Sequence, residues 1–256
     1  MAAVDGEARR RGVSLFEGLE IPPCHYSWDH NQDAAAQFLR VMEEGWRAIK
    51  TKGWADVEKT QQTLETMVEL TEDMHRMSVE LPKLRVDFNS CLSADSFNEL
   101  MERISGRVVV RLDFVEDPFP YEAAQWVEVK ERWVWLDFAL DKQLRGAVEG
   151  FDVAVLKPGR REWRELVSEL PPSVKVVMTS AMDHAIGQSF AAYEAALAWN
   201  ELGDRMDLCG LCTEHLFERD AFFERLNSRG GMLEVDRMGT GLGFDEVIAG
   251  LPWQRL

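Results

Sequence analysis

The residues of this sequence that could do chemistry together are acids and lysines at the carboxyl ends of predicted strands. The stretch RLDFVEDPFPYE, residues 111 to 122, begins as a buried strand and ends in Glu116 and Asp117. A carboxylate at such a point is costly to desolvate unless it is paired or binds a cation. Other strand-like runs end in acids or lysines, which gives the candidate set Lys50, Lys52, Asp87, Glu116, Asp137 and Lys157.

The acids of this set predict a metal site. Asp87, Glu116 and Asp137 are 29 and 21 residues apart, which matches one strand and one helix per step. Carboxylate oxygens with open coordination positions suit Mg²⁺, for which Mn²⁺ is a substitute. Because side chains alternate along a strand, Lys50 and Lys52 share one face. These lysines and Lys157 are therefore predicted to flank the metal from opposite sides.

The elements that position these side chains are predicted to form a parallel sheet. Short apolar runs alternate with longer helical patterns, which is typical of βαβ units. The predicted strands are residues 24 to 28, 46 to 52, 83 to 89, 108 to 116, 132 to 137, 151 to 157, 174 to 180 and 207 to 213. This pattern favours an α/β fold, a closed (β/α)8 barrel of the TIM type, whose active sites lie at the carboxyl ends of the strands.

Three regions are expected along the chain. Residues 1 to 22 are predicted to hold a leading helix, with Gly12 as its stop signal, and residues 23 to 226 the catalytic barrel. Residues 227 to 256 are predicted to form an extension that packs on the barrel. The GTGLG motif in this tail lacks the Lys-Ser/Thr of a P-loop, so a turn-rich segment is favoured over a phosphate loop.

Composition narrows the classes of partner. Acids outnumber Lys and Arg by 45 to 29, for a formal charge of -16, so nucleic acids and anionic membranes are poor partners. No apolar run approaches the length of a transmembrane helix and the start lacks a signal peptide, so a cytoplasmic protein is expected. Four scattered cysteines are too few for a disulfide scaffold, and reduced thiols are expected.

The order of these motifs resembles the enolase superfamily, and within it the o-succinylbenzoate synthases of menaquinone synthesis, in the branch that is similar to muconate-lactonizing enzymes. The stretches that carry the resemblance are AIKTKG, LRVDFNSCLS, FVEDPFPYE, FDVAVLKP, VVMTSAMDHAIG and TGLGFDEVIAGLPW. They run from about residue 45 to the C-terminus. The resemblance implies an enzyme, a lyase that uses Mg²⁺ on a small carboxylate substrate.

Two features depart from that family. Asp137 is followed by Phe138, where the family commonly has Glu or Asn, and Asp141 is a rival third ligand. Asp137 is preferred because it closes the strand-like run RWVWLD and leaves 20 residues before Lys157, whereas Asp141 leaves 16. The family's N-terminal α+β capping domain is also expected to be largely absent. A barrel without that cap is expected to self-associate or to bind a separate cap fragment.

The resemblance also implies roles for individual residues. Lys52 is expected to be the base that removes a proton α to the substrate carboxylate, Lys50 to lower the pKa of Lys52, and Lys157 to act as a stabilising cation. Asn89 is expected to support the metal, and Ser180, Asp183 and His184 to contact substrate. Two alternatives stay open: a racemase or epimerase of N-acylamino acids or dipeptides with Lys52 and Lys157 as its two bases, and a non-catalytic truncated barrel.

Overall fold

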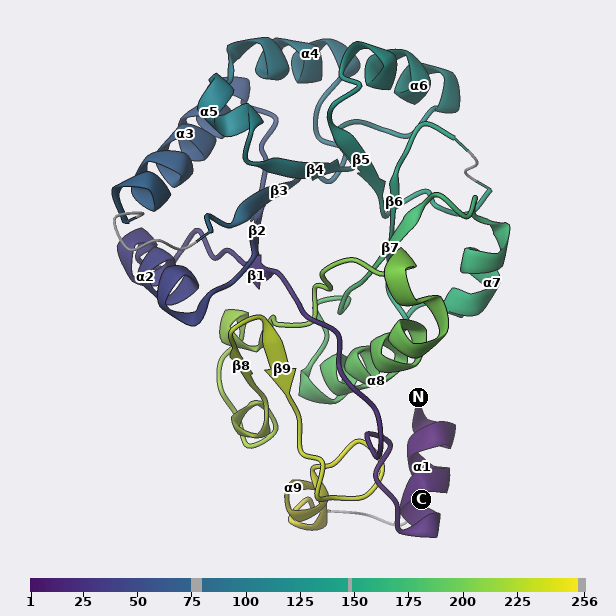
Figure 1. The fold of residues 1–256 in the computed structure, drawn as a ribbon. Coiled ribbons are helices and arrows are strands. Elements are labelled where there is room, and N and C mark those ends of the chain that lie inside the picture. The colour runs from purple at the N-terminus through teal and green to yellow at the C-terminus, as the bar shows by residue number, and fades with distance from the viewer. Residues whose placement is uncertain (75–79, 147–148, 253–256) are drawn as a thin grey trace.

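Seven parallel strands form one sheet that curls into a ring surrounded by helices (Figure 1). The computed structural model describes residues 1–74, 80–146 and 149–252. The strands are paired in chain order, from β1 to β7, so each strand is hydrogen-bonded to the next strand along the chain. Their bounds are β1 Tyr26–Ser27, β2 Ala48–Lys52, β3 Lys83–Asp87, β4 Leu112–Glu116, β5 Asp137–Leu140, β6 Val153–Leu156 and β7 Lys175–Met178.

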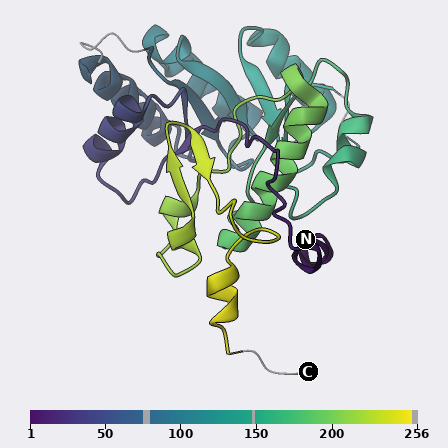
Figure 2. The ribbon, with the colours of Figure 1, turned by 60° about the horizontal axis from the view of Figure 1, so that its bottom comes forward.

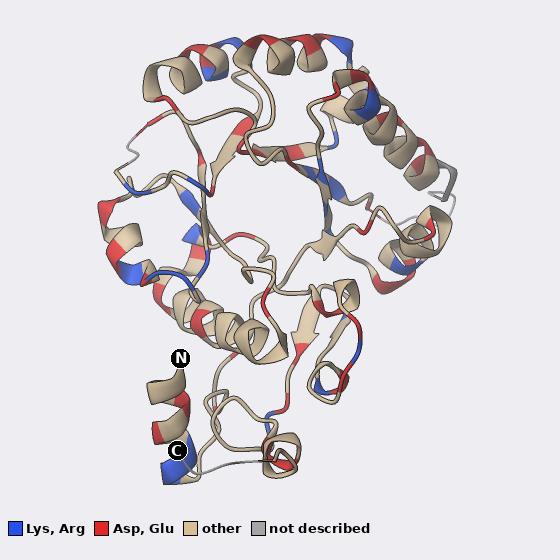
Figure 3. Ribbon diagram, turned by 180° about the vertical axis from the view of Figure 1, so that it is seen from behind, with Lys and Arg blue, Asp and Glu red and all other residues tan. Residues whose placement is uncertain are grey.

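The register of the strands aligns their carboxyl ends. Lys52 is paired with Asp87, Asp87 with Glu116, and Glu116 with Ala139. Because neighbouring parallel strands end at the same edge, side chains at these positions meet on one face of the barrel. Figure 3 shows charged positions on the strands around the centre of the ring.

The eighth predicted strand, residues 207 to 213, is not a regular strand in the structure. The segment 206–210 instead makes isolated parallel bridges: Met206 with Val176 and Gly210 with Thr179 on one side, and Cys209 with Cys24 on the other. Backbone hydrogen bonds from Cys209 to Pro23 (2.8 Å) and from His25 to Cys209 (2.9 Å) complete this contact. The segment 206–210 therefore closes the ring, because it bridges the β7 region on one side and the chain just before β1 on the other.

The main helices connect successive strands and cover the outside of the sheet (Figure 1). Several begin at a side chain that caps a backbone N–H, as Asp33, Ser93, Ser105 and Glu122 do. Their bounds are α2 Ala34–Glu44, α3 Val57–Met74, α4 Ala94–Arg103, α5 Gly106–Val109, α6 Ala123–Arg132, α7 Trp163–Glu169 and α8 Ala185–Leu202, and short 3₁₀ turns follow at η2 Gly203–Arg205, η3 Glu214–Leu216 and η4 Phe223–Arg225. No helix in the described part of the chain is long and apolar enough to span a membrane.

The two ends of the chain pack together beside the barrel (Figure 2). Helix α1 (Ala2–Arg11) ends at Gly12, in the left-handed conformation expected of a helix stop (φ 68°). The GTGLG segment binds this helix: the Leu242 N–H donates to Asp5 (2.7 Å) and the Arg9 guanidinium donates to the Gly243 carbonyl (2.6 Å). The hairpin of β8 (Asn227–Arg229) and β9 (Met232–Glu234) and the short helix α9 (Asp245–Ala249) complete the tail.

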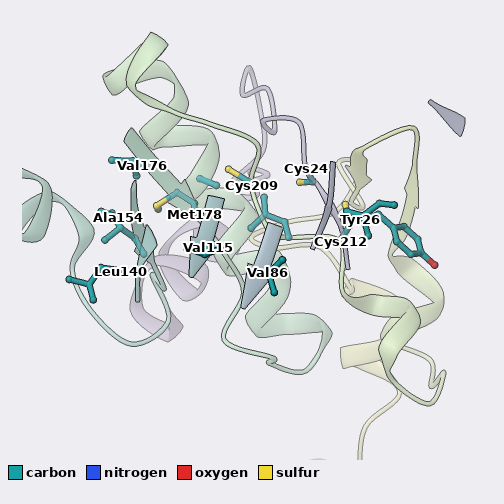
Figure 4. Close-up of a cluster of buried hydrophobic side chains, with 14 of the residues drawn as sticks. Cys24, Tyr26, Val86, Val115, Leu140, Ala154, Val176, Met178, Cys209 and Cys212 are labelled. Carbon is teal, nitrogen blue, oxygen red and sulfur yellow. The ribbon is translucent and has the colours of Figure 1, made fainter. Parts of the chain in front are cut away.

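Alternating side chains divide the core into two layers. Val86, Val115, Leu140 and Val176 belong to the large cluster of buried residues that includes side chains of the surrounding helices (Figure 4). The alternate residues Phe114, Ala139, Val153, Val155 and Val177 form a separate small cluster. The inner face of the ring therefore has an apolar centre, and polar side chains occupy its two ends.

Two strand predictions were wrong at their boundaries. Residues 132 to 137 contain the end of α6 and a turn, and β5 begins where this prediction ended, at Asp137. The apolar residues of that run did not mark a buried strand, because Val134 is 78% and Trp135 45% exposed. Residues 108 and 109 likewise lie in α5, and β4 begins at Leu112. The four cysteines are free, as expected of reduced thiols.

Candidate active site at the carboxyl ends of the strands

A cavity of about 400 Å³ lies at the carboxyl ends of the strands. This volume is in the range of sites for small molecules. Seven of the candidate site residues line it: Lys50, Lys52, Asp87, Asn89, Asp141, Lys157 and Ser180. Because Lys50 and Lys52 come from β2 and Lys157 follows β6, the cavity extends across the mouth of the ring.

Lys50 lies between two carboxylates. Its Nζ is 2.6 Å from Oε2 of Glu116 and 3.4 Å from Oδ2 of Asp87. Burial by itself lowers the pKa of Lys50, but Glu116 and Asp87 outweigh burial and raise that pKa above its ordinary value. Lys50 therefore stays protonated and acts as a fixed cation.

Lys52 is more accessible than Lys50. Its side chain is 53% exposed, against 17% for Lys50, and its Nζ lies 2.6 Å from Oδ2 of Asp87. Burial raises the pKa of Asp87, but the ammonium groups of Lys50 and Lys52 lower it to about 2. Asp87 is thus an ionised carboxylate that also accepts a hydrogen bond from the Asn89 N–H (3.0 Å).

Glu116 is the most buried of the candidate acids. Burial raises its pKa, and although Lys50 lowers it, Asp87 and Asp141 contribute to a final pKa of about 7. Asp87 and Asp141 raise the pKa of Glu116, so the three carboxylates repel one another although each has a lysine partner. A cation bound here would relieve that repulsion.

The third predicted ligand, Asp137, is corrected by the structure. Asp137 is the first residue of β5 and is paired with Phe114, so it lies at the amino end of the strand, away from Glu116. Asp141 follows the last residue of β5 and lines the cavity, where it forms an ion pair with Lys157. Both acids have the same parity along the strand, so alternation could not separate them. The candidate acids are therefore Asp87, Glu116 and Asp141.

Asp117 fixes the backbone that follows β5. Its carboxylate accepts hydrogen bonds from the backbone N–H groups of Asp141 (3.1 Å) and Lys142 (3.2 Å). Burial raises the pKa of Asp117 to about 6. Asp117 is the second acid of the pair that ends β4, and its role was not predicted from the sequence.

The predicted substrate residues divide into two groups. Ser180 lines the cavity and its Oγ lies 3.0 Å from Oγ1 of Thr213, and Asn89 lines it as well. Asp183 and His184 do not line this cavity. Asp183 accepts a hydrogen bond from the Ala181 N–H (3.1 Å), and the Nε2 of His184 lies 2.8 Å from Oδ2 of Asp220.

The sequence also did not predict a buried charged residue that lies next to the site. Arg85, fully buried two residues before Asp87, donates to Asp113 (2.6 Å) and to Asp207 (2.8 Å). Its Nη1 lies 3.1 Å from Nδ1 of His25, which lines the cavity. Burial and the positive charges of Arg85 and Lys50 lower the pKa of His25 well below its usual value. The spacing of Arg85 and Asp87 on one face of β3 was the signal that could have revealed it.

The carboxylates of Asp87, Glu116 and Asp141 are ligands that suit a divalent cation, although in the structure they are paired with lysines. In residues 1–74, 80–146 and 149–252, no three His, Cys, Asp or Glu side chains form a ready-made metal centre. Ammonium groups of Lys50, Lys52 and Lys157 instead pair with the acids. The donor set is all oxygen, as Mg²⁺ prefers. A bound cation would favour the ionised form of buried Glu116, whose pKa is raised to about 7 without one.

The chain is 29% identical over its whole length to an o-succinylbenzoate synthase of Bdellovibrio bacteriovorus, of which it spans 76%. No protein-family model matches the chain.

Several solved structures have a similar fold. A mandelate racemase/muconate lactonizing protein of Herpetosiphon aurantiacus matches 94% of this chain and 70% of its own, with a TM-score of 0.71 and 16% identity. Muconate cycloisomerase of Pseudomonas fluorescens matches 97% of this chain and 72% of its own (TM-score 0.69, 18% identity). A dipeptide epimerase of Methylococcus capsulatus, complexed with Mg and a dipeptide, matches 95% and 70% (TM-score 0.63, 20% identity).

Two expectations are confirmed by these likenesses. The fold is a barrel like those of these solved structures. The similarity to an o-succinylbenzoate synthase, expected from about residue 45 onward, extends over the full chain.

Proposed function

We propose that this chain is an Mg²⁺-dependent dehydratase that forms o-succinylbenzoate, as part of menaquinone synthesis. The observation that carries the proposal is that Lys52 and Lys157 line one cavity from β2 and β6, while the strands that bear the acids, β3 to β5, lie between them. The identity with an o-succinylbenzoate synthase supports the choice of reaction.

Asp87, Glu116 and Asp141 would hold the metal ion. When bound, Mg²⁺ supplies electrostatic stabilisation of the negative charge that develops on the substrate carboxylate as the α-proton leaves. The all-oxygen donor set supports this role, and so does the Mg in the complex of the dipeptide epimerase with a similar fold. Asp117 keeps Asp141 at the cavity by accepting its backbone N–H.

Lys52 is the proposed base. Its half-exposed side chain lines the cavity, so its nitrogen can reach a bound substrate. Asp87, whose Oδ2 lies 2.6 Å from the Lys52 Nζ, holds that nitrogen at the cavity. Protonated Lys52 then returns its proton to the departing hydroxyl group on the same face of the substrate.

Lys157 is the proposed cation on the other side of the substrate. Its ion pair with Asp141 holds the ammonium group at the cavity wall. There it favours the negative charge that develops in the transition state. Asn89 orients Asp87 through its backbone N–H, and Ser180 offers a hydroxyl to the substrate from the wall formed after β7.

A racemase or epimerase is the second candidate. The observation in its favour is the presence of two lysines on different sides of the same cavity, because a two-base mechanism needs one base on each face of the α-carbon. The identity with an o-succinylbenzoate synthase favours dehydration over this alternative.

The test supplies both substrate classes to the purified protein with Mg²⁺. One arm uses the cyclohexadiene precursor of o-succinylbenzoate and follows product by absorbance. The other uses N-succinyl amino acids in D₂O and follows α-proton exchange by NMR. Dehydration without exchange supports the proposal, and exchange without dehydration supports the epimerase. Reaction with neither, while Mg²⁺ still binds, supports the non-catalytic barrel.

A further inference from the structure

Three buried cysteines lie together where the barrel closes (Figure 4). Cys24 comes just before β1, and Cys209 and Cys212 belong to the segment that follows η2. Cys24 and Cys209 are bridge partners, and the thiol of Cys24 also interacts with that of Cys212. We call the contact between residues 23–25 and residues 209–212 the seam. The cysteines therefore connect two segments that are far apart in the chain.

The seam is paired over a shorter length than the regular strands of the sheet. Strands β2 and β3 are paired over five successive residues, whereas Cys24 and Cys209 form an isolated bridge. Backbone hydrogen bonds cross the seam from the Cys209 N–H to Pro23 and from the His25 N–H to Cys209. Local opening costs least where few backbone contacts must break. We therefore expect the ring to open locally at the seam.

The thiols are protected while the seam is closed. Cys24 is 1% exposed, and Cys209 and Cys212 are fully buried. Burial raises the pKa of both Cys209 and Cys212 well above the usual value. Because the thiolate is the reactive form of cysteine, the closed seam does not react with an oxidant in solution. The fourth cysteine, Cys91, is exposed in the loop after β3 and lies outside the seam.

Cys212 is the better partner for Cys24. The two thiols interact directly, and Cys24 has a larger effect on the pKa of Cys212 than Cys209 has. A disulfide requires the sulfur atoms to approach to about 2 Å, so a pair already in contact needs a small movement. A bond between Cys209 and Cys212 would join two residues of one segment and would leave the ring open.

We propose that Cys24 and Cys212 form a disulfide in the presence of a small-molecule disulfide such as oxidised glutathione, and that this bond closes the barrel covalently. When the seam opens, one cysteine thiolate attacks oxidised glutathione and displaces one glutathione thiolate. The second cysteine attacks the mixed disulfide and displaces the other glutathione. The protein loses two electrons and two protons, and two molecules of reduced glutathione form.

The bond changes both stability and the wall of the main cavity. A disulfide between segments that are distant in the chain restricts the unfolded state over a long loop, which stabilises the fold. His25 and Thr213, which follow the two cysteines in the chain, line the main cavity. The disulfide therefore joins two parts of that wall. This proposal is independent of the proposed reaction.

The test oxidises the folded protein and identifies the linked residues. Cys91→Ser serves as the background, because it removes the exposed thiol. The protein is incubated with oxidised glutathione without denaturant, digested without reduction and mapped by mass spectrometry, and its melting temperature is measured before and after oxidation. Cys24→Ala and Cys212→Ala each remove one partner in this background. Cys209→Ala is the matched control, since it removes a buried thiol of the same cluster.

The expected product is a peptide pair that links Cys24 to Cys212. Its formation should raise the melting temperature by about 5 °C or more, and dithiothreitol should reverse the increase. Cys209→Ala should keep both the bond and the increase, whereas Cys24→Ala and Cys212→Ala should lose the increase. The melting transitions of the reduced variants show whether each is folded, and the peptide map of the background protein does not depend on them.

Three results would overturn the proposal. The first is a bond between Cys209 and Cys212, or between Cys24 and Cys209, in place of the expected one. The second is a product that carries only glutathione adducts or no modification. The third is oxidation that occurs only at urea concentrations that unfold the whole protein, because local opening of the seam would then play no part.

Discussion

The ammonium group of Lys50 joins two carboxylates, with its Nζ 2.6 Å from Glu116 and 3.4 Å from Asp87. Glu116 is 2% exposed, so the stronger of these ion pairs is removed from water. Breaking a buried pair by removing one partner leaves an uncompensated charge, which is more costly than replacing both partners. The site is therefore expected to contribute to the stability of the fold as well as to its chemistry.

This relationship predicts the stability of variants in the presence of a chelator. Lys50→Met should lower the free energy of unfolding by about 3 to 5 kcal/mol. Adding Glu116→Gln to Lys50→Met should recover part of that loss. The measurement is urea denaturation, with Arg164→Met as a control, because Arg164 forms an exposed pair with Glu201 that is worth less than about 1 kcal/mol. A loss from Lys50→Met as small as that of the control would contradict the buried pair.

The corrected ligand set predicts how Mg²⁺ changes thermal stability. Mg²⁺ should raise the melting temperature of the unmodified protein, because a ligand that binds only the folded state stabilises it. Asp87→Asn, Glu116→Gln and Asp141→Asn should each abolish the increment. Asp137→Asn is the matched control, since Asp137 begins β5 at the opposite end of the barrel and should leave the increment intact. Loss of the increment in Asp137→Asn and its retention in Asp141→Asn would reverse the correction.

Buried His25 predicts a pH dependence of stability. Its pKa in the folded protein is lowered by burial and by the charges of Arg85 and Lys50, so it is neutral there, whereas in the unfolded chain it is protonated below about pH 6.5. The unfolded state then binds more protons, so stability falls as the pH drops below about 6.5, by about 1.4 kcal/mol per unit for this group. Denaturation of His25→Gln and the unmodified protein at pH 8 and 5.5 measures the difference. Equal losses in both proteins would show that His25 does not contribute.

Much of the site could be predicted from the sequence, because β2, β3 and β4 end directly at the residues concerned. Lys50, Lys52, Asp87 and Glu116 close apolar runs, and the alternation of side chains puts them on the inner face. The loop after β6 starts at Lys157, as expected, because the run FDVAVLK has no competing polar end. For these strands the local pattern and the tertiary arrangement agree.

The end of β5 could not be predicted, because two exposed apolar residues precede this strand and shift the apolar pattern toward the N-terminus. Val134 and Trp135 lie in a turn before β5, so the apolar run continues through residues that are not in the sheet. What determines the end of the strand is a distant contact, in which Asp117 accepts the backbone N–H groups of Asp141 and Lys142.

The central claim is that Lys52 performs proton transfer at the mouth of this barrel, and steady-state kinetics of Lys52→Ala test it most directly. With Mg²⁺ and the cyclohexadiene precursor, Lys52→Ala should lower kcat by a factor of about 1,000 or more, which corresponds to about 4 kcal/mol of lost transition-state stabilisation. Lys175→Ala, which removes an exposed lysine at the amino end of β7, should keep kcat within a factor of about two. If Lys52→Ala turns over the precursor as fast as Lys175→Ala does, Lys52 is not the base and the account is wrong.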